Sequence, residues 1–244
     1  MLQQTQVSRV IPKYLAFVDA FPTPSACAAA SLGDVLRLWQ GLGYPRRARN
    51  LHATAASVSA RGPFPRTLEE LIALPGVGGY TARAVLAFAY EADAAVVDTN
   101  IARVYARVMG RPLRAREVQA VADAHAPVGD SWAWNQSIME LGAMVCRPAP
   151  LCDQCPVAPM CVWQGSATDD PAIGSAGVST AQRRFDGSDR QARGSLMRAA
   201  GAGALPPTSL AEIAGRDAEH AARLADALVS EGLLTRDAEG YRLP

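Results

Sequence analysis

Apolar residues recur at three- and four-residue intervals along most of the chain, which is the period of helices that bury one face. Start and stop signals agree with this pattern: Thr23-Pro24 and the segment Ser31 to Asp34 are typical helix starts, and Gly41 is a typical stop. Helices are predicted at residues 32–40, 80–90, 98–109, 116–125 and 132–145, with a short one beginning at Thr67. Alternation of the kind that marks strands is scarce before residue 230. The pattern predicts an all-α fold class.

The composition changes after residue 165. Residues 166–189 are rich in Ser, Asp, Gly and Pro and are typical of a linker. Three helical patterns and one hairpin pattern follow, at residues 190–200, 208–214, 217–232 and 233–243, the hairpin turning at Glu239-Gly240. Residues 166–244 hold nine Arg and eleven acidic side chains, a poor balance for binding DNA. We therefore expect residues 190–244 to form a small winged-helix-like module for packing or interaction.

Composition narrows the class of protein further. Hydrophobic residues make up 49% of the 244 positions and aromatic residues 6%, with abundant alanine, which favours closely packed helices. No apolar run is long enough to span a bilayer. The net charge of +1 is low for a nucleic-acid binder, so a basic surface has to be local. Arg46, Arg47 and Arg49, beside Gly43 and Tyr44, form the candidate patch; a solvated helix start has the same pattern.

Residues 74–81, Leu-Pro-Gly-Val-Gly-Gly-Tyr-Thr, place glycines in a turn between two helical patterns. Glycine can adopt a positive φ and admits a close backbone approach, and the amides that start the next helix can hold one phosphate. Such a grip positions a DNA backbone without reading its sequence. Ordinary turns share this composition. A dinucleotide site would need a preceding strand, which the sequence before Gly76 does not predict.

The run Val-Val-Asp-Thr-Asn at residues 96–100 puts Asp98 at the head of the helix predicted at 98–109. The helix dipole favours a carboxylate at that position. An aspartate there is in most proteins simply an N-cap. A lone carboxylate that follows a phosphate grip also suggests chemistry at a nucleic-acid sugar.

Four of the five cysteines lie within sixteen residues, at Cys146, Cys152, Cys155 and Cys161, in the pattern C-x5-C-x2-C-x5-C. The sequence shows no secretory signal, so we expect free thiols rather than a disulfide framework. Closely spaced thiolates are typical of zinc sites and of iron–sulfur clusters. Zinc sites generally use two short Cys pairs, whereas this pattern has one, so the spacing favours iron–sulfur and leaves zinc open.

These features resemble the endonuclease III superfamily of base-excision DNA glycosylases. Four further segments resemble its A/G-specific adenine glycosylases: Met-Leu-Gln-Gln-Thr-Gln-Val (1–7), Gly-Leu-Gly-Tyr (41–44), Arg-Ala-Arg-Asn-Leu-His (47–52) and Met-Glu-Leu-Gly-Ala-Met-Val-Cys (139–146). The resemblance covers about residues 1–165 and implies a helix-hairpin-helix glycosylase domain there, with a 4Fe-4S cluster loop at 146–161 ligated by the four cysteines. The linker at 166–189 and the module at 190–244 rest on composition and pattern instead.

The resemblance also implies a substrate and residue roles. The substrate would be double-stranded DNA with adenine opposite 8-oxoguanine or guanine, bound by a monomer in the bacterial cytoplasm near the nucleoid. Catalytic roles fall to Asp98, which would stabilise a sugar cation, and to Tyr80 and Asn100, which would orient the intermediate. DNA-binding roles fall to Gln3, Gln4, Tyr44, Arg46, Gly76, Gly78 and Gly79.

Two of these roles concern the space that a flipped base leaves. Gln4 would fill the vacated site with Gln3 beside it, and Tyr44 would stack next to the opposite base. The plain alternatives are exposed helix polar residues for the two glutamines and a core-edge aromatic for Tyr44.

Lysine usage bears on strand cleavage. Bifunctional members of this superfamily use a hairpin lysine to form a Schiff base and then cleave the strand. The matching position here is Tyr80, and the only lysine of the chain is Lys13. We therefore expect a monofunctional glycosylase that hydrolyses the N-glycosidic bond.

The sequence departs from the family pattern at three places. Five residues instead of six separate Cys146 from Cys152, and about eighty residues after the cysteines are too few for the Nudix-like domain of many adenine glycosylases. The catalytic glutamate expected two residues before the Met-Leu-Gln-Gln motif is not part of residues 1–244. We therefore expect this chain to bind mismatched DNA but to excise adenine very slowly or not at all, and an in-frame extension with the glutamate to restore turnover. A thymine-mismatch glycosylase and a DNA-lesion-binding protein with impaired catalysis are the alternatives.

Overall fold

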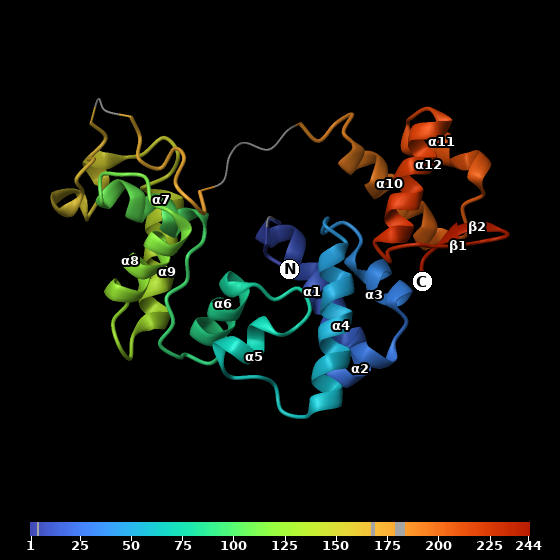
Figure 1. Cartoon of the computed structure of the whole chain (residues 1–244), viewed down its shortest axis with the longest axis horizontal. Helices are drawn as coiled ribbons and strands as arrows, with labels where there is room; N and C mark the ends of the chain where they lie inside the picture. Colours follow the sequence, from blue (N-terminus) through green and yellow to red (C-terminus); the bar gives the residue numbers. More distant parts are fainter. Residues whose placement is uncertain (4, 167–168, 179–183) are drawn as a thin grey trace. The chain divides into compact units, whose positions relative to one another are not determined.

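The computed structural model describes residues 1–3, 5–166, 169–178 and 184–244 (Figure 1). The chain divides into two compact units. Unit 1 comprises Met1–Phe64, Leu74–Gly76 and Gln182–Pro244, and unit 2 comprises Pro65–Ala73 and Val77–Ala181. Both units are built mainly from helices, and each has its own buried core.

The first part of unit 1 contains four helices. They are α1 (Val7–Ala20), α2 (Pro24–Ala29), α3 (Leu32–Trp39) and α4 (Arg46–Arg61). Side-chain caps set two of the starts, because Thr23 accepts from the amide of Ala26 and Ser31 from the amide of Asp34, each over 3.1 Å. Such caps satisfy amides that a helix start leaves unpaired. The helix starts predicted at Thr23 and Ser31 are confirmed.

The C-terminal part of unit 1 has three helices followed by a two-stranded antiparallel sheet. The elements are α10 (Asp189–Ala202), the 3₁₀ turn η3 (Pro207–Ser209), α11 (Leu210–Ala214), α12 (Ala218–Ser230), β1 (Thr235–Asp237) and β2 (Gly240–Arg242). Thr235 pairs with Arg242 across the hairpin, and a bridge joins Leu205 to Tyr241. The order of three helices and a hairpin is the one predicted from the sequence.

One hydrophobic core joins the two parts of unit 1. Leu36 of α3, Leu196 of α10 and Leu228 of α12 are almost fully buried in the same cluster. Burying a side chain of this size stabilises a fold by roughly 1.5–3 kcal/mol. Pro244 also contacts α3, because the amide of Gly33 donates to the carbonyl of Pro244 over 2.9 Å. The C-terminal helices therefore pack on α1–α4 through a shared core.

Unit 2 holds the remaining described helices. They are α5 (Leu68–Ile72), α6 (Gly79–Ala89), α7 (Thr99–Val108), α8 (Ala115–His125), α9 (Ser131–Met144) and the 3₁₀ turns η1 (Cys152–Gln154) and η2 (Ala158–Met160). Helix α7 is its centre, since every residue from Ile101 to Arg107 is buried and α7 packs against both α8 and α9. A helix that is buried on all sides has to satisfy any charged side chain internally.

The helices predicted between residues 32 and 145 are confirmed, and their ends differ by at most one residue from those observed. Local signals explain this accuracy: Thr67 and Glu70, for example, form a reciprocal capping box that starts α5. Among the described residues, no helix is both long and apolar enough to cross a membrane.

The segment predicted as a linker at 166–189 is partly packed. Asp170 forms an ion pair with Arg107, and the buried Ser175 accepts from the amide of Leu113 over 3.0 Å. The linker prediction is therefore wrong over residues 170–175, because polar side chains that look like linker composition are here used as internal hydrogen-bonding partners. The division of the chain into the predicted domains stays a prediction.

Candidate active site and metal centre

The turn between α5 and α6 uses its glycines in different ways. Gly76 has a φ of 72°, and a Cβ there would lie 2.6 Å from the Cβ of Asn50, so a side chain does not fit. Gly78 has a φ of −94°, and both Gly78 and Gly79 have open space where a Cβ would stand. A positive φ is thus required only at Gly76. Helix α6 begins at its N-cap, Gly78, which has no side chain to accept a hydrogen bond from the first amides of the helix.

Asp98 is the N-cap of α7, as predicted. Its Oδ1 accepts from the amide of Ile101 over 2.7 Å, and its Oδ2 accepts from Nδ2 of Asn100 over 3.1 Å. Both carboxylate oxygens are therefore held in place, and the positive end of the α7 dipole faces them. A carboxylate fixed in this way is ready to stabilise a positive charge without first reorienting.

Tyr80, in the first turn of α6, lies near this carboxylate. Burial and the nearby charge of Asp98 raise the pKa of the Tyr80 phenol above its ordinary value. The side chain is still 41% exposed, so it can be reached from solvent. The structure thus joins Asp98 and Asn100 by a hydrogen bond and places Tyr80 where the charge of Asp98 acts on its phenol; all three were predicted as catalytic residues.

Arg103 connects Asn100 to α9 and to the first cysteine. It is only 6% exposed. Its Nη2 donates to Oδ1 of Asn100 over 2.8 Å and to the carbonyl of Gly142 over 2.6 Å, and its Nε donates to the carbonyl of Cys146 over 2.6 Å. These acceptors satisfy a guanidinium that would otherwise be costly to bury. Helix α9 can come close to α7 at this point because position 142 is a glycine: a Cβ there would lie 2.6 Å from the Cβ of Asn100.

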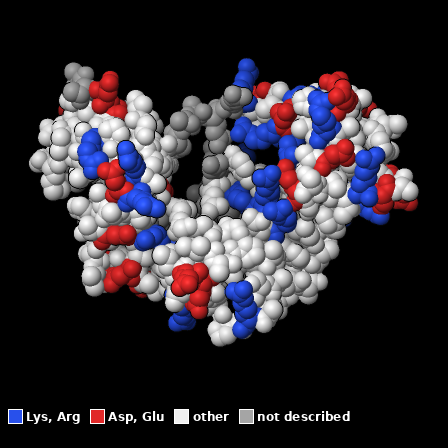
Figure 2. Space-filling view, in the orientation of Figure 1, with Lys and Arg blue, Asp and Glu red and all other residues white. Residues whose placement is uncertain are grey.

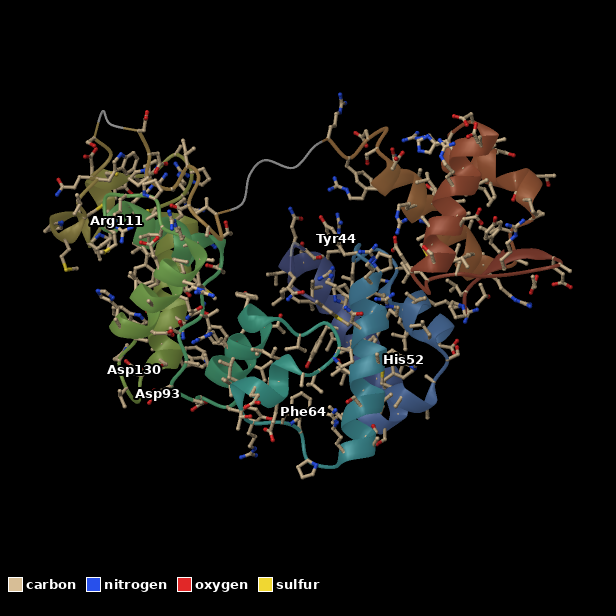
Figure 3. All side chains as sticks on the ribbon, viewed as in Figure 1. Tyr44, His52, Phe64, Asp93, Arg111 and Asp130 are labelled. Atoms are coloured by element: carbon tan, nitrogen blue, oxygen red, sulfur yellow. The ribbon has the colours of Figure 1, made fainter. Side chains whose placement is uncertain are left out.

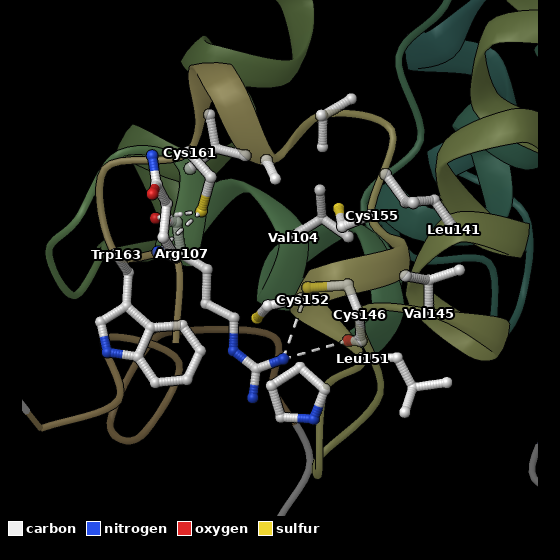
Figure 4. A pocket seen from close by; sticks show the side chains of 15 residues that line it. Val104, Arg107, Leu141, Val145, Cys146, Leu151, Cys152, Cys155, Cys161 and Trp163 are labelled. Atoms are coloured by element: carbon white, nitrogen blue, oxygen red, sulfur yellow. Dashed lines mark hydrogen bonds between the residues drawn. The ribbon is translucent and has the colours of Figure 1, made fainter. Parts of the chain in front are cut away.

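The four cysteines Cys146, Cys152, Cys155 and Cys161 are free thiols that line one cavity (Figure 4). The other walls are mainly apolar and include Val104, Leu141, Val145, Leu151 and Trp163. Burial raises the pKa of the Cys146 thiol, and burial together with the neighbouring thiols raises that of Cys152. The loop that is one residue shorter than the family pattern therefore still brings Cys146 and Cys152 to the same cavity. In the described part of the chain, no three Cys, His, Asp or Glu side chains converge tightly enough to hold a single metal ion.

Arg107 lies one turn after Arg103 in α7, and its guanidinium contacts the cysteine loop (Figure 4). Its Nη1 donates to Sγ of Cys146 over 3.4 Å, and its Nε and Nη2 donate to the two carboxylate oxygens of Asp170 over 3.0 and 2.6 Å. These bonds from Arg107 hold the pKa of Asp170 below its ordinary value. The guanidinium also lies over the ring of Trp163 at 4.8 Å. A buried, two-point ion pair of this kind gives both strength and a fixed geometry.

The residues predicted to contact bases are in unit 1. Gln4 lies outside the described residues. The carbonyl of Gln3 accepts from Arg47 over 2.8 Å. Tyr44, just before α4, is 40% exposed and has a φ of 49°, a rare value for a residue with a side chain (Figure 3). Arg46 is 63% exposed and pairs with Glu231 over 2.8 Å. The basic patch predicted around Arg46 is therefore largely engaged with partners inside unit 1.

Sequence reasoning missed Arg103 and Arg107. The available signal was their spacing: the two arginines stand four residues apart in a segment, Ile101 to Val108, whose other residues are apolar or aromatic. Residues four apart share one face of a helix, so two charges on a buried helix indicate an internal partner. That partner is the cysteine loop.

Comparison with known proteins identifies the family. Residues 1–126 match the HhH-GPD superfamily of base excision DNA repair proteins. An adenine DNA glycosylase from Mycolicibacterium smegmatis is 38% identical over 254 residues, which cover 98% of this chain and 83% of that protein. The fold is similar to that of a thermostable thymine-DNA glycosylase, with a TM-score of 0.62 and 25% identity over 67% of this chain and 80% of that one. It is also similar to endonuclease III in a non-covalent DNA complex, with a TM-score of 0.60 and 26% identity over 66% of this chain and 78% of that one. The chain therefore belongs to the HhH-GPD superfamily of base excision DNA repair proteins and, within it, to the adenine DNA glycosylases.

Proposed function

We propose that this chain removes adenine mispaired with 8-oxoguanine or guanine from double-stranded DNA by hydrolysing the N-glycosidic bond. The observation that carries the proposal is the carboxylate of Asp98, fixed by the amide of Ile101 and by Asn100, with the phenol of Tyr80 close to it. Membership of the adenine DNA glycosylases supports adenine as the leaving base. The similarity to endonuclease III in a DNA complex supports duplex DNA as the substrate.

The chemistry follows from what cleavage of this bond requires. An adenine inside a duplex is out of reach, so the nucleotide has to be extruded at a cost of a few kcal/mol. When the C–N bond breaks, its electron pair stays with adenine, which takes up a proton from solvent. The sugar gains positive charge, which the oriented Asp98 carboxylate stabilises until water adds and releases a proton. A preorganised group of this kind is worth about 10²–10³-fold in rate. Asn100 keeps the carboxylate oriented, and the Tyr80 phenol, whose pKa is raised, keeps its proton and can donate a hydrogen bond to the substrate.

Strand cleavage is not part of the proposed reaction. A Schiff base needs an amine at the hairpin position, and this chain has a phenol there, at Tyr80. A phenol cannot form the imine that a lyase uses. The reaction therefore ends with an abasic site in an intact strand.

DNA contacts are proposed for both units. The uncapped amides at the start of α6, at Gly78 and Gly79, suit one phosphate of the backbone. In unit 1 the exposed ring of Tyr44 would stack on a base, and Gln3 and Gln4 would fill the space that the flipped base leaves.

We further propose that Cys146, Cys152, Cys155 and Cys161 hold a 4Fe-4S cluster. The donor set fits, since all four thiols line one mostly apolar cavity and Arg107 donates a hydrogen bond to Sγ of Cys146. The bound group would supply a covalent tie between the cysteine loop and the end of α9. Zinc is the alternative that the cysteine spacing leaves open, although a zinc ion would need the thiols to converge more closely than they do among the described residues. The iron and zinc content of the purified protein separates the two.

For residues 190–244 we propose a winged-helix-like packing module. Several of its arginines are paired with acidic side chains: Arg223 with Glu219 over 2.7 Å and Arg236 with Asp226 over 3.4 Å. Figure 2 shows the same intermixing of basic and acidic side chains over the C-terminal helices. Together with the core shared with α3, this balance supports packing rather than a DNA-binding surface.

The test is single-turnover excision from duplexes with adenine opposite 8-oxoguanine or guanine, followed long enough to detect slow turnover. Asp98→Asn is expected to remove the activity, since asparagine can still cap α7 but carries no charge. Asp217→Asn is the matched control, because Asp217 caps α12 through the amide of His220 over 2.8 Å. Excision of thymine opposite guanine, in place of adenine, would refute the proposal, as would full activity in Asp98→Asn.

A further inference from the structure

Two segments of unit 1 carry the side chains proposed to contact bases. The N-terminal segment, of which the structure describes residues 1–3 and Thr5, contains Gln3, and the glycine loop, residues 41–44, contains Tyr44. The two segments are far apart in sequence, so their relative position has to be fixed by side chains.

One guanidinium joins these two segments. Nη1 of Arg47 donates to the carbonyls of Met1 and Gln3 over 3.0 and 2.8 Å, and Nη2 donates to the carbonyls of Leu42 and Gly43 over 3.0 and 3.2 Å. Nη1 thus contacts the N-terminal segment, and the two carbonyls that Nη2 contacts belong to the glycine loop. The planar fork of arginine has the geometry for such a bridge, with two pairs of donors held at a fixed angle.

The same guanidinium is enclosed on its other sides. Its carbon lies 5.3 Å from the ring centre of Trp39 and 5.6 Å from that of Tyr44. Nη2 is also 3.3 Å from Oγ1 of Thr5. The hydrogens on both Nη atoms are therefore directed to acceptors inside unit 1, and little of Arg47 remains to bind a phosphate.

The glycine loop needs support of this kind. Gly41, Gly43 and Tyr44 have φ values of 91°, 71° and 49°, so three of its four residues have left-handed backbone. Such a conformation persists only where neighbouring groups hold it. Here Trp39 donates from Nε1 to the carbonyl of Gly43 over 3.0 Å, and Thr5 donates from Oγ1 to the carbonyl of Leu42 over 3.0 Å.

We infer that Arg47 is a positioning residue that sets Tyr44 in register with the N-terminal segment, so that stacking and filling of the vacated site occur together on mispaired DNA. The inference rests on the proposed function, because it takes these segments to be the ones that meet the bases. It also replaces the DNA-backbone role considered for Arg47 in the sequence.

The test separates the fork geometry of Arg47 from its charge. Arg47→Lys keeps the charge but loses the paired donors. We expect its preference for an adenine·8-oxoguanine duplex over a matched duplex to fall about tenfold, the size of one lost base-pair discrimination. The fluorescence rise of 2-aminopurine placed at the adenine position should fall with it. Binding to the matched duplex should stay within about twofold, since phosphate contacts carry that term.

Two further variants complete the experiment. Thr5→Val removes the hydroxyl that joins the two segments and should lower mispair preference in the same direction by a few-fold, the effect of one hydrogen bond. Arg198→Lys, at an exposed position of α10, is the matched control and should behave as wild type. Far-UV circular dichroism and the melting temperature report whether each variant folds.

The outcomes are distinct. Wild-type mispair preference in a folded Arg47→Lys would show that charge alone matters and would overturn the inference. If Arg47→Lys does not fold, unchanged preference in Thr5→Val overturns it, and reduced preference supports it. A wild-type protein with no preference for the mispair would instead count against the proposed function.

Discussion

A single added methyl group at Gly142 should disable the candidate active site without unfolding the protein. Gly142 lies inside α9 and faces Asn100, which is hydrogen-bonded to Asp98. In Gly142→Ala the new Cβ would stand 2.6 Å from the Cβ of Asn100 and 2.9 Å from its carbonyl oxygen. The second contact is with backbone, so no rotation of a side chain relieves it. Helices α7 and α9 have to move apart locally.

The size of the effect can be estimated from the two opposing terms. Overpacking in a well-packed region costs about 1–3 kcal/mol. Replacing glycine by alanine inside a helix returns about 1 kcal/mol. The net loss of stability is therefore about 0–2 kcal/mol, or a melting temperature up to about 8 °C lower for a chain of this size. The catalytic effect should be larger, since a displacement of about 1 Å at a reacting group costs about 10²-fold in rate.

The assay compares the single-turnover excision rate with the melting temperature. Gly194→Ala is the control, because Gly194 lies inside α10 and a Cβ there meets nothing within 4 Å. That variant should gain up to about 1 kcal/mol of stability and keep its activity. Gly142→Ala with wild-type excision would show that Asn100 tolerates the displacement and would refute the reasoning. Equal losses of activity in both variants would refute it too.

Three further outcomes are expected. Gly76→Ala should weaken binding to both matched and mispaired DNA, measured by fluorescence anisotropy, because the φ of 72° at Gly76 and its contact with Asn50 exclude a side chain. Gly78→Ala should fold normally, as its melting temperature would show, because a Cβ at Gly78 meets open space. Cys152→Ser should lower the bound iron per chain and the visible absorbance of anaerobically prepared protein, and Cys27→Ser, outside the cysteine loop, should not. Hydrogen bonds from Arg46 and then Arg193 hold the pKa of Glu231 below its ordinary value. The ion pairs of the Glu231 carboxylate therefore stabilise the fold above the unfolded pKa of about 4.3, and this stabilisation is lost as the pH falls through the folded pKa. Urea unfolding of Glu231→Gln should therefore show lower stability than wild type at pH 7 and a smaller decrease below pH 4.

Much of the helical framework and the position of the Asp98 carboxylate at the start of α7 could be predicted because their signals are local. The caps at Ser31 and Thr67, and the aspartate that opens α7, each act over three or four residues of chain. The cysteine spacing is likewise a local pattern, and the four thiols do line one cavity. Such features survive in sequence because no distant partner is needed to interpret them.

The partners of charged side chains could not be predicted, since they come from distant parts of the chain. Arg46 and Glu231 are 185 residues apart in sequence, so no local signal predicts that this largely exposed arginine pairs with an acidic side chain. Asp170 lies in a segment of linker-like composition, and only its pairing with Arg107, 63 residues away in sequence, shows that it is packed. A solvated arginine and a buried one have the same local sequence signal, and only the fold separates them.

The arrangement of α7 also explains why the cysteine loop and the candidate active site cannot be altered independently. The carbonyl of Cys146 accepts from both Arg103 and Arg107, over 2.6 and 3.2 Å. Arg103 in turn donates to Asn100 over 2.8 Å, and Asn100 donates to Asp98 over 3.1 Å. Three hydrogen bonds thus connect the first cysteine to the carboxylate, through an arginine that is only 6% exposed, so bulk solvent has little access to replace a lost acceptor. A change that shifts Cys146 should therefore lower the excision rate more than it lowers DNA binding, because the three hydrogen bonds lie within unit 2, whereas the residues proposed to contact bases belong to unit 1.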